Sequence, residues 1–241
     1  IYPLLLAVLS RAFGAPPRAP ADAPLPSIAL IIAAHNEAAI IESRIANALA
    51  LDYPADRLRI VLASDGSTDG TAELVGKYEP RVRVLHFKDR RGKPATLNDA
   101  VAACDAEIVA FSDANTFMDP ASLRHLARWF ADSTVGAVCG RLILTDSATG
   151  GNADGLYWRY ETFLKRHESR LGALLGANGA IYAIRRGLYR RLPAGTVVDD
   201  VVVPLMARLE SRARIVYDES ALAMEETPAA LRDEFGRRAR I

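Results

Sequence analysis

The sequence predicts an α/β fold with a mostly parallel central sheet covered by helices on both faces. Three strand-length segments are almost continuously apolar, and helix-length segments lie between them. Continuous apolar strands are typical of a parallel sheet buried on both faces, whereas a strand with one solvated face alternates. The expected strands are Ser27–Ala34, Leu58–Ser64 and the first residues of Val109–Thr116, and the expected helices are Glu37–Ala50, Thr68–Tyr78, Pro94–Cys104 and Pro120–Ala131.

Polar residues follow each of the three expected strands. In an open α/β sheet, ligands bind outside the carboxyl ends of the strands, so these side chains are expected to meet at one edge. Asp119 and Pro120 also mark a helix start, as an N-cap acid followed by proline at the first helical position. The strand-end residues are Ala34, His35, Glu37, Asp65, Asp113 and Asn115.

Asp113 and Asn115 lie two residues apart directly after the third strand. Their carboxylate and amide oxygens are hard ligands of the kind that Mg²⁺ or Mn²⁺ accepts, and Mg²⁺ usually completes its shell with water and phosphate oxygens. A solvated turn with an Asx hydrogen bond explains the same pair equally well. The pair is therefore a candidate metal site.

Composition sets the broad class of the protein. A chain of 241 residues that is 50% hydrophobic can bury the core of one large domain or of one and a half. A formal net charge of +1 gives no reason to expect nucleic acid as a partner. Cys104 and Cys139 lie in apolar segments, which favours two small buried hydrophobes in a reducing compartment over a disulfide.

The first 26 residues differ from the rest. Residues 1–14 begin with ten mostly apolar residues, too few to span a bilayer, which needs about 20. They are expected to be the end of a membrane segment, with an amphipathic or core helix as the alternative. Arg11 and Arg18 would then place the following domain in the cytoplasm. Residues 15–26 contain five prolines and are expected to form an extended linker to a domain spanning 27–241.

Seven motifs in order resemble a known family. They are AHNE, SDGSTDGT, GKPATLNDA, FSDANT, GANGAIYAIRR, VVDD and RRAR. The sequence is similar to the family-2 inverting glycosyltransferases, which have the GT-A fold. The resemblance covers residues 27–241 and is closest to the membrane-bound branch that includes cellulose, chitin, hyaluronan and poly-N-acetylglucosamine synthases.

The resemblance implies a nucleotide-sugar site at the strand ends. It places Asp65 on the uracil or ribose, with Ala34, His35 and Glu37 flanking the same pocket. Lys93, in a basic loop before a helix, would meet the diphosphate as a point charge. The alternatives from the residues alone are a turn or helix-cap role for Asp65 and a solvated loop for Lys93.

Asp113 and Asn115 become the metal–diphosphate site under this resemblance, with Mg²⁺ or Mn²⁺ as a Lewis acid on the leaving group. The family usually has two acids here, so Asn115 implies weaker cation binding without nucleotide. The final motif is usually Q-x-x-R-W. Arg240 matches the arginine of this motif, and both Arg238 and Arg240 are assigned to the nucleotide sugar. Ile241 replaces the tryptophan and is assigned to the acceptor site. A basic amphipathic helix is the alternative.

The resemblance also assigns the acceptor side of the site. Asp200 matches the family's general base, and Asp199 is its acidic neighbour. Adjacent carboxylates in an apolar setting disfavour ionisation, which suits a base; helix N-capping is the alternative role of either residue. Gly176 and Asn178 would form the floor of the acceptor pocket.

The expected activity is transfer of one sugar from a nucleotide donor, a UDP-sugar, to a hydroxyl of a glycan or lipid-linked acceptor at the cytoplasmic face of a membrane. A rival interpretation is a non-catalytic relative that binds nucleotide or glycan and scaffolds a synthase; the departures at Asn115 and Ile241 favour it, and Asp200 argues against it. A nucleotidyltransferase lacks its glycine-rich opening here, and a P-loop enzyme is excluded because the chain has no G-x-x-x-x-G-K-[ST] motif.

Overall fold

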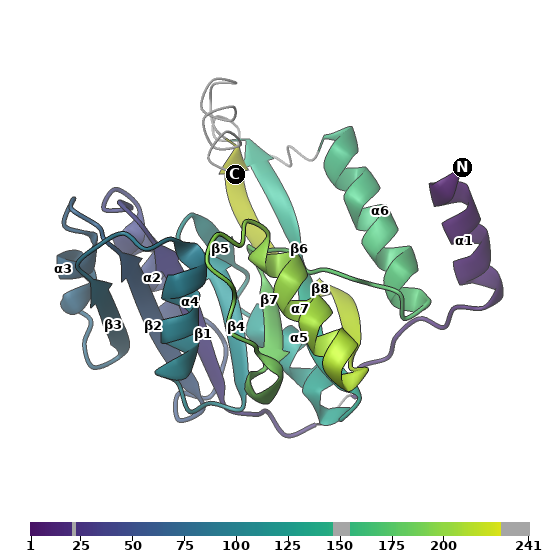
Figure 1. The fold of residues 1–241 in the computed structure, drawn as a ribbon, viewed down its shortest axis with the longest axis horizontal. Helices are drawn as coiled ribbons and strands as arrows, with labels where there is room; N and C mark the ends of the chain where they lie inside the picture. The colour runs from purple at the N-terminus through teal and green to yellow at the C-terminus, as the bar shows by residue number, and fades with distance from the viewer. Residues whose placement is uncertain (21–22, 147–154, 228–241) are drawn as a thin grey trace.

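The computed structural model describes residues 1–20, 23–146 and 155–227. Eight strands in this part of the chain form one sheet in the order β3-β2-β1-β4-β7-β6-β8-β5 (Figure 1). The strands are β1 Ile28–Ala34, β2 Leu58–Asp65, β3 Val82–Phe87, β4 Ile108–Asp113, β5 Thr116–Met118, β6 Val135–Asp146, β7 Tyr182–Arg185 and β8 Arg214–Thr227.

The first half of the sheet is parallel, as the apolar runs predict. β1 pairs with both β2 and β4, and β2 pairs with β3, all in parallel. Register brings Ala33 level with Asp113 and Ala34 level with Ser64, so the three expected strands end together. The predicted strand bounds agree with the structure to within one residue at their starts.

The second half of the sheet mixes directions. β7 pairs antiparallel with β4 and β6, β5 pairs antiparallel with β8, and β6 pairs parallel with β8. Four of the seven pairings are therefore parallel. The polarity of the sheet changes at β4, which has a parallel neighbour on one side and an antiparallel one on the other.

Helices cover both faces of the sheet, as predicted. α4 and α7 pack on one face, and α2 and α5 pack on the other (Figure 1). The helices are α1 Tyr2–Ala12, α2 Ile41–Leu49, α3 Thr71–Gly76, α4 Lys93–Ala102, α5 Ser122–Ala127, α6 Leu156–Arg170 and α7 Asp199–Ser211, with short 3₁₀ turns at Arg128–Ala131 and Arg186–Leu188.

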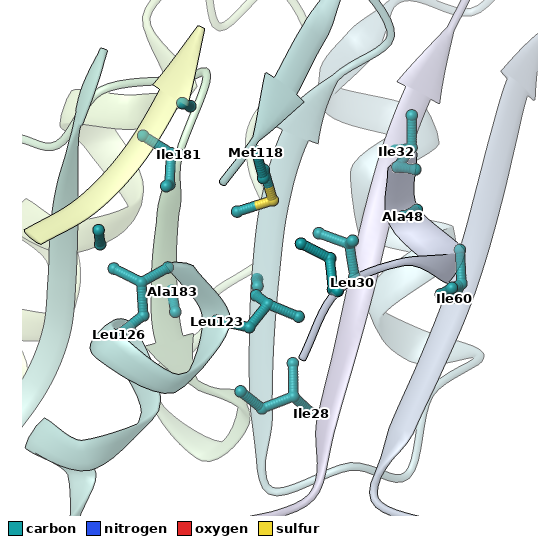
Figure 2. Packing of buried hydrophobic residues seen from close by; sticks show 14 of the residues in the cluster. Ile28, Leu30, Ile32, Ala48, Ile60, Met118, Leu123, Leu126, Ile181 and Ala183 are labelled. Carbon is teal, nitrogen blue, oxygen red and sulfur yellow. The ribbon is translucent and has the colours of Figure 1, made fainter. Parts of the chain in front are cut away.

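The buried side chains explain why β1 is apolar throughout its length. Alternate residues Ile28, Leu30 and Ile32 face the layer of α2 and α5, where Leu123 and Met118 meet them (Figure 2). The intervening Ile31 faces the other layer, beneath α4. A strand with both faces buried in this way has no solvated position, so each of its side chains contributes to the core.

Three helices begin later than predicted: α2 at Ile41 instead of Glu37, α3 at Thr71 instead of Thr68, and α5 at Ser122 instead of Pro120. α5 begins at Ser122 with Ala121 as its N-cap, two residues later than the Asp119–Pro120 signal indicates. The Asp119 carboxylate accepts a hydrogen bond from the Ala121 amide, and its carbonyl accepts one from Ser122. Asp119 therefore closes a turn that precedes the helix. Its carboxylate accepts a backbone amide hydrogen bond there, as it would at a helix N-cap.

The N-terminal segment forms α1, which packs against α6. Ser10 Oγ and His167 Nδ1 are hydrogen-bonded at 2.5 Å, and Tyr2 Oη donates to Glu168. The residues between α1 and β1 that the structure describes have no helix or strand, and Leu25 packs on the core. Within the described ranges, no helix is both long enough and apolar enough to cross a bilayer.

Candidate active site

Five of the predicted nucleotide-site residues line one pocket at the carboxyl edge of the parallel half-sheet. The pocket has a volume of about 150 Å³. A second cavity has a volume of about 440 Å³ and lies between the basic loop (residues 88–92) and residues 194–197, which precede α7. The two cavities share Arg90, Gly92 and Lys93. The predicted residues that line the first pocket are Ala34, His35, Asp65, Lys93 and Asp113.

Asp65, the last residue of β2, anchors the basic loop. Its carboxylate oxygens accept hydrogen bonds from the backbone amides of Arg91 at 2.8 Å and Gly92 at 2.9 Å. The next residue, Gly66, has φ +64°, and a Cβ there would lie 2.4 Å from the Arg90 nitrogen. Only glycine allows this approach of the two backbones, so the Asp65–Gly66 pair fixes the loop over the pocket.

His35 is oriented by the same turn. Its Nδ1 donates to the Asp65 carbonyl at 2.7 Å. Nε2 of the ring is then the acceptor for the side-chain Nδ2 of Asn36 at 3.5 Å. Glu37 lies in the following turn, where its amide donates to Thr71 Oγ1, and it is not among the residues lining the pocket. Asp69 accepts hydrogen bonds from the Ala38 and Thr71 amides, so its role is to close the turn.

Lys93 lies between two acidic residues at the first turn of α4. Its Nζ donates to Oδ1 of Asp113 at 2.8 Å and lies 3.5 Å from Oδ1 of Asp199. Burial acts to lower the pKa of Lys93, but the surrounding carboxylates, Asp113 above all, outweigh it and raise that pKa. Lys93 is therefore a permanent cation that joins the end of β4 to the start of α7.

Asp199 is the more buried of the two adjacent acids, with 5% of its surface exposed. Burial raises its pKa above the ordinary value, an effect that Lys93 opposes and that Asp200 and Asp113 reinforce. Among the described residues, its buried Oδ2 has no hydrogen-bond partner. Val198 is the N-cap of α7 and both acids lie inside its first turn, so the capping alternative is wrong for both.

A loop between α6 and β7 holds Asp200 by its backbone and its side chain. The Ala177 amide donates to the Asp200 carbonyl at 2.8 Å, and the Gly179 amide donates to Oδ2 of Asp200 at 3.0 Å. Gly176 contacts the helix so closely that a Cβ there would lie 3.0 Å from Val201 Cγ2. Within the described residues, Oδ1 of Asp200 accepts no hydrogen bond. The structure thus places Gly176 against Val201, and the following residues Ala177 and Gly179 against Asp200.

Asn178 has a local role in the same loop. Its Oδ1 accepts from the Ala180 amide at 3.2 Å, and its carbonyl accepts from Ile181. On α6, Trp158 packs partly buried against the core while Tyr157 is exposed. Asn98 is a structural hydrogen bonder, because its side chain bonds both backbone groups of Leu192.

Asn115 lies in the turn after β4 and donates through Nδ2 to Glu225 Oε1 at 2.6 Å. An amide bonded through nitrogen keeps its oxygen as an acceptor. Among the described residues, no group of three or more His, Cys, Asp or Glu side chains is placed to hold one ion. The Asp113 carboxylate and the Asn115 amide oxygen are of the ligand types that Mg²⁺ or Mn²⁺ accepts, and a cation held by two protein oxygens would take its remaining ligands from water and diphosphate.

The turn that bears Asp113 and Asn115 is clamped by a fully buried arginine that sequence reasoning missed. Arg44 Nε donates to the Asp113 carbonyl at 3.4 Å, and its Nη1 donates to Asn47 Oδ1. Asn47 bonds both backbone groups of Met118. Burial lowers the pKa of Arg44 to about 10 against the opposing charge of Asp113. A charged residue on the apolar face of α2 was the available signal.

Three predicted residues, Arg238, Arg240 and Ile241, lie outside the described part of the chain. The remaining geometry joins a pocket at the end of a parallel half-sheet to an acidic pair on α7. That arrangement, with a mixed half-sheet completing the fold, defines a GT-A glycosyltransferase domain. Residues 29–192 match the family described as Glycosyl transferase family 2, so the chain belongs to that family, and the predicted family and fold are confirmed.

Two curated relatives are similar to this chain. The beta-monoglucosyldiacylglycerol synthase of Synechocystis sp. is 32% identical over 142 residues, which cover 56% of this chain and 30% of the relative. The poly-beta-1,6-N-acetyl-D-glucosamine synthase of Staphylococcus aureus is 26% identical over 215 residues, which cover 86% of this chain and 52% of the relative. The chain thus spans about a third to a half of the length of these proteins.

Two solved structures have the same fold. The mannosyltransferase PcManGT of Pyrobaculum calidifontis, in complex with GDP-Man and Mn²⁺, has a TM-score of 0.83 and 26% identity, covering 99% of this chain and 68% of its own. Residues 1–349 of S. aureus TarS, in complex with UDP-GlcNAc, have a TM-score of 0.64 and 16% identity, covering 85% of this chain and 59% of theirs. The second likeness concerns the fold alone.

Proposed function

We propose that this glycosyltransferase moves a sugar from a UDP-sugar to a hydroxyl of a glycan or lipid-linked acceptor, with inversion at the anomeric carbon. The observation that carries the proposal is the junction at Lys93, which joins the strand-end pocket to the acidic start of α7. A donor in the pocket would present its diphosphate to this cation. The reacting carbon would then lie next to Lys93, on the side of the pocket where α7 begins with Asp199 and Asp200.

Asp200 is the proposed general base. As the acceptor oxygen attacks the anomeric carbon, the bond to the diphosphate breaks, and the acceptor proton passes to the Asp200 carboxylate. Gly179 holds one carboxylate oxygen, which leaves Oδ1 for that proton. A positioned base of this kind contributes roughly 10²–10⁴-fold to a rate. The departing diphosphate leaves with the electron pair of the broken bond and is neutralised by Lys93.

Asp113 and Asn115 are the proposed holders of Mg²⁺ or Mn²⁺. A bound divalent ion would supply Lewis-acid neutralisation of the leaving diphosphate. The similar mannosyltransferase contains Mn²⁺ with its nucleotide sugar, which supports a divalent ion here. That relative binds GDP-Man, so the uridine base in our proposal rests on the family resemblance and needs a direct test.

Membrane association, with the domain at the cytoplasmic face, is also proposed. α1 buries Leu6 and Ala7 but leaves large apolar side chains exposed, among them Leu4 at 75% and Val8 at 62%. Apolar residues in this number on one short helix favour burial in a bilayer or against membrane segments. Arg11 and Arg18 follow the apolar residues, which supports the cytoplasmic side.

A non-catalytic scaffold is the second candidate, and one observation favours it: the Asn115 amide is engaged by Glu225 where the family usually has a second acid. A single experiment separates the two functions. Full-length protein in lipid nanodiscs is incubated with a panel of UDP- and GDP-sugars and Mn²⁺, and release of nucleoside diphosphate is measured. Release of UDP from a UDP-sugar supports the proposal. Release from a GDP-sugar alone would show that the nucleotide is guanosine diphosphate instead of uridine diphosphate. Binding of a donor without release favours the scaffold.

A further inference from the structure

Lys165 on α6 is a largely buried lysine that no step of the proposed reaction uses. Its side chain is only 13% exposed, and it lies one helical turn after Glu161, whose Oε1 is 2.8 Å from Nζ. The same ammonium donates to the carbonyl oxygen of Ala177 at 2.9 Å. A buried cation is retained only where charge and hydrogen bonds compensate its desolvation, and here both come from identified groups.

Ala177 is part of the loop that holds Asp200. Its amide donates to the Asp200 carbonyl, and two residues later the Gly179 amide donates to the Asp200 carboxylate. Lys165 therefore holds the loop through Ala177, the same residue whose amide bonds Asp200. The chain of contacts runs from Glu161 through Lys165 and the loop backbone to the carboxylate.

We propose that Lys165 is a positioning residue that holds the 176–179 loop against α7 and thereby aims the Asp200 carboxylate at the acceptor. The inference rests on the proposed function, because it gives Lys165 its effect through the base. It assigns Lys165 no contact with donor or acceptor. Glu161 is the partner that keeps the ammonium in place.

The geometry explains why a lysine is suited to this position. The loop approaches α7 closely at Gly176, where a Cβ would lie 3.0 Å from Val201 Cγ2, whereas a Cβ at Gly179 would meet Asp200 at an ordinary contact distance of 3.5 Å. Two glycines also make the loop backbone permissive, so the approach needs an external tie. A hydrogen bond from a charged donor to a carbonyl is about twice as strong as one from a neutral donor.

Steady-state kinetics on full-length protein test the proposal. Lys165→Met should lower kcat by about 10–100-fold, the size of effect that a small misplacement of a reacting group has, while the KM for the donor changes less than about threefold. Lys165→Arg keeps the charge and the donors and should recover most of kcat. Lys77→Met, at an exposed lysine on the far side of the parallel half-sheet, is the matched control and should change neither constant.

A double mutant shows whether Lys165 acts through Asp200. If it does, adding Lys165→Met to Asp200→Asn should lower kcat no further than Asp200→Asn alone, because the group being aimed is already gone. Multiplicative losses in the double mutant would overturn the proposal. So would a Lys165→Met enzyme with normal kcat.

Hydrogen–deuterium exchange gives a readout that needs no activity. Peptides covering residues 172–181 should exchange at least tenfold faster in Lys165→Met than in wild type, with peptides from β1 and β4 unchanged. Unchanged exchange in the loop overturns the proposal even if activity falls. If wild-type protein transfers no sugar from any donor, the proposed function fails by itself, and faster loop exchange would still assign Lys165 to the loop that holds Asp200.

Discussion

Lys93 Nζ lies 2.8 Å from Oδ1 of Asp113, so the first residue of α4 neutralises the last residue of β4. In this arrangement, a lysine occupies one oxygen of the carboxylate that we assign to a metal. The metal ion and the lysine ammonium compete for the negative charge of the Asp113 carboxylate until a diphosphate supplies further negative charge. Because of this competition, the affinity of the site for a metal ion should depend on whether a diphosphate is bound.

Lys93→Met should change metal and nucleotide affinity in opposite directions. Removing the ammonium frees the Asp113 carboxylate, so Mn²⁺ should bind more tightly in the absence of nucleotide. UDP should bind about tenfold more weakly, because a charge that meets its diphosphate is lost. Isothermal titration calorimetry measures both, with Lys77→Met as the control. Equal loss of both affinities would show that Lys93 supports the pocket only structurally.

Asp199→Asn should stabilise the domain at neutral pH. Because the pKa of Asp199 is raised in the folded state, its contribution to stability is present below the ordinary pKa and is lost as pH rises through the raised one. An asparagine has no such loss. We expect the variant to melt about 2–4 °C above wild type at pH 7, which corresponds to about 1 kcal/mol for a domain of this size. The difference should shrink as the pH approaches about 4, and a gap that is constant with pH would contradict the account.

Asp200→Asn should slow transfer by roughly 10²–10⁴-fold while donor binding barely changes, because the carboxylate acts on the acceptor. The asparagine retains the oxygen that accepts from Gly179, so the fold is kept. Single-turnover rates and donor titrations measure the two effects separately. Asp199→Asn is the matched control and should cost much less activity. Near-normal transfer by Asp200→Asn would remove Asp200 from the mechanism.

Asn115→Asp should make the domain depend on a cation. The change replaces the amide donor that contacts Glu225 Oε1 with a second carboxylate at the same place. Loss of the hydrogen bond and the new repulsion should lower the melting temperature by several degrees, and Mn²⁺ with UDP should restore it. Asn115→Ala loses the bond without adding charge, so Mn²⁺ should not rescue it. A variant whose melting temperature ignores Mn²⁺ would place the metal elsewhere.

The sequence predicts three of the four parallel strands well because burial on both faces leaves a continuous apolar signal in β1, β2 and β4, whereas β3, which has exposed and half-buried positions, lacks that signal and was not predicted. It also predicts the strand-end residues, since parallel strands end at one edge. The antiparallel half is harder to predict. β7 is only four residues long, and β6 and β8 have half-buried positions that interrupt their apolar pattern.

The supporting residues of the site could not be predicted for a different reason. Arg44 and Lys165 both act on backbone carbonyls, those of Asp113 and Ala177. Every residue has a carbonyl, so such contacts leave no side-chain pattern in the partner segment. Only the three-dimensional approach of the two segments shows them.

The change of polarity at β4 has a consequence for how such a protein can diversify. Among the residues that the structure describes, those assigned to the donor and its metal come from the segment 34–115, and those assigned to the acceptor come from 176–200. The two segments belong to halves of the sheet that meet along β4 and β7, and Lys93 and Asp199 link their sites across that seam. The proposed donor and acceptor residues thus lie on opposite sides of one seam, and a substitution on one side would alter one of the two proposed specificities while leaving the strand pairing of the other side in place.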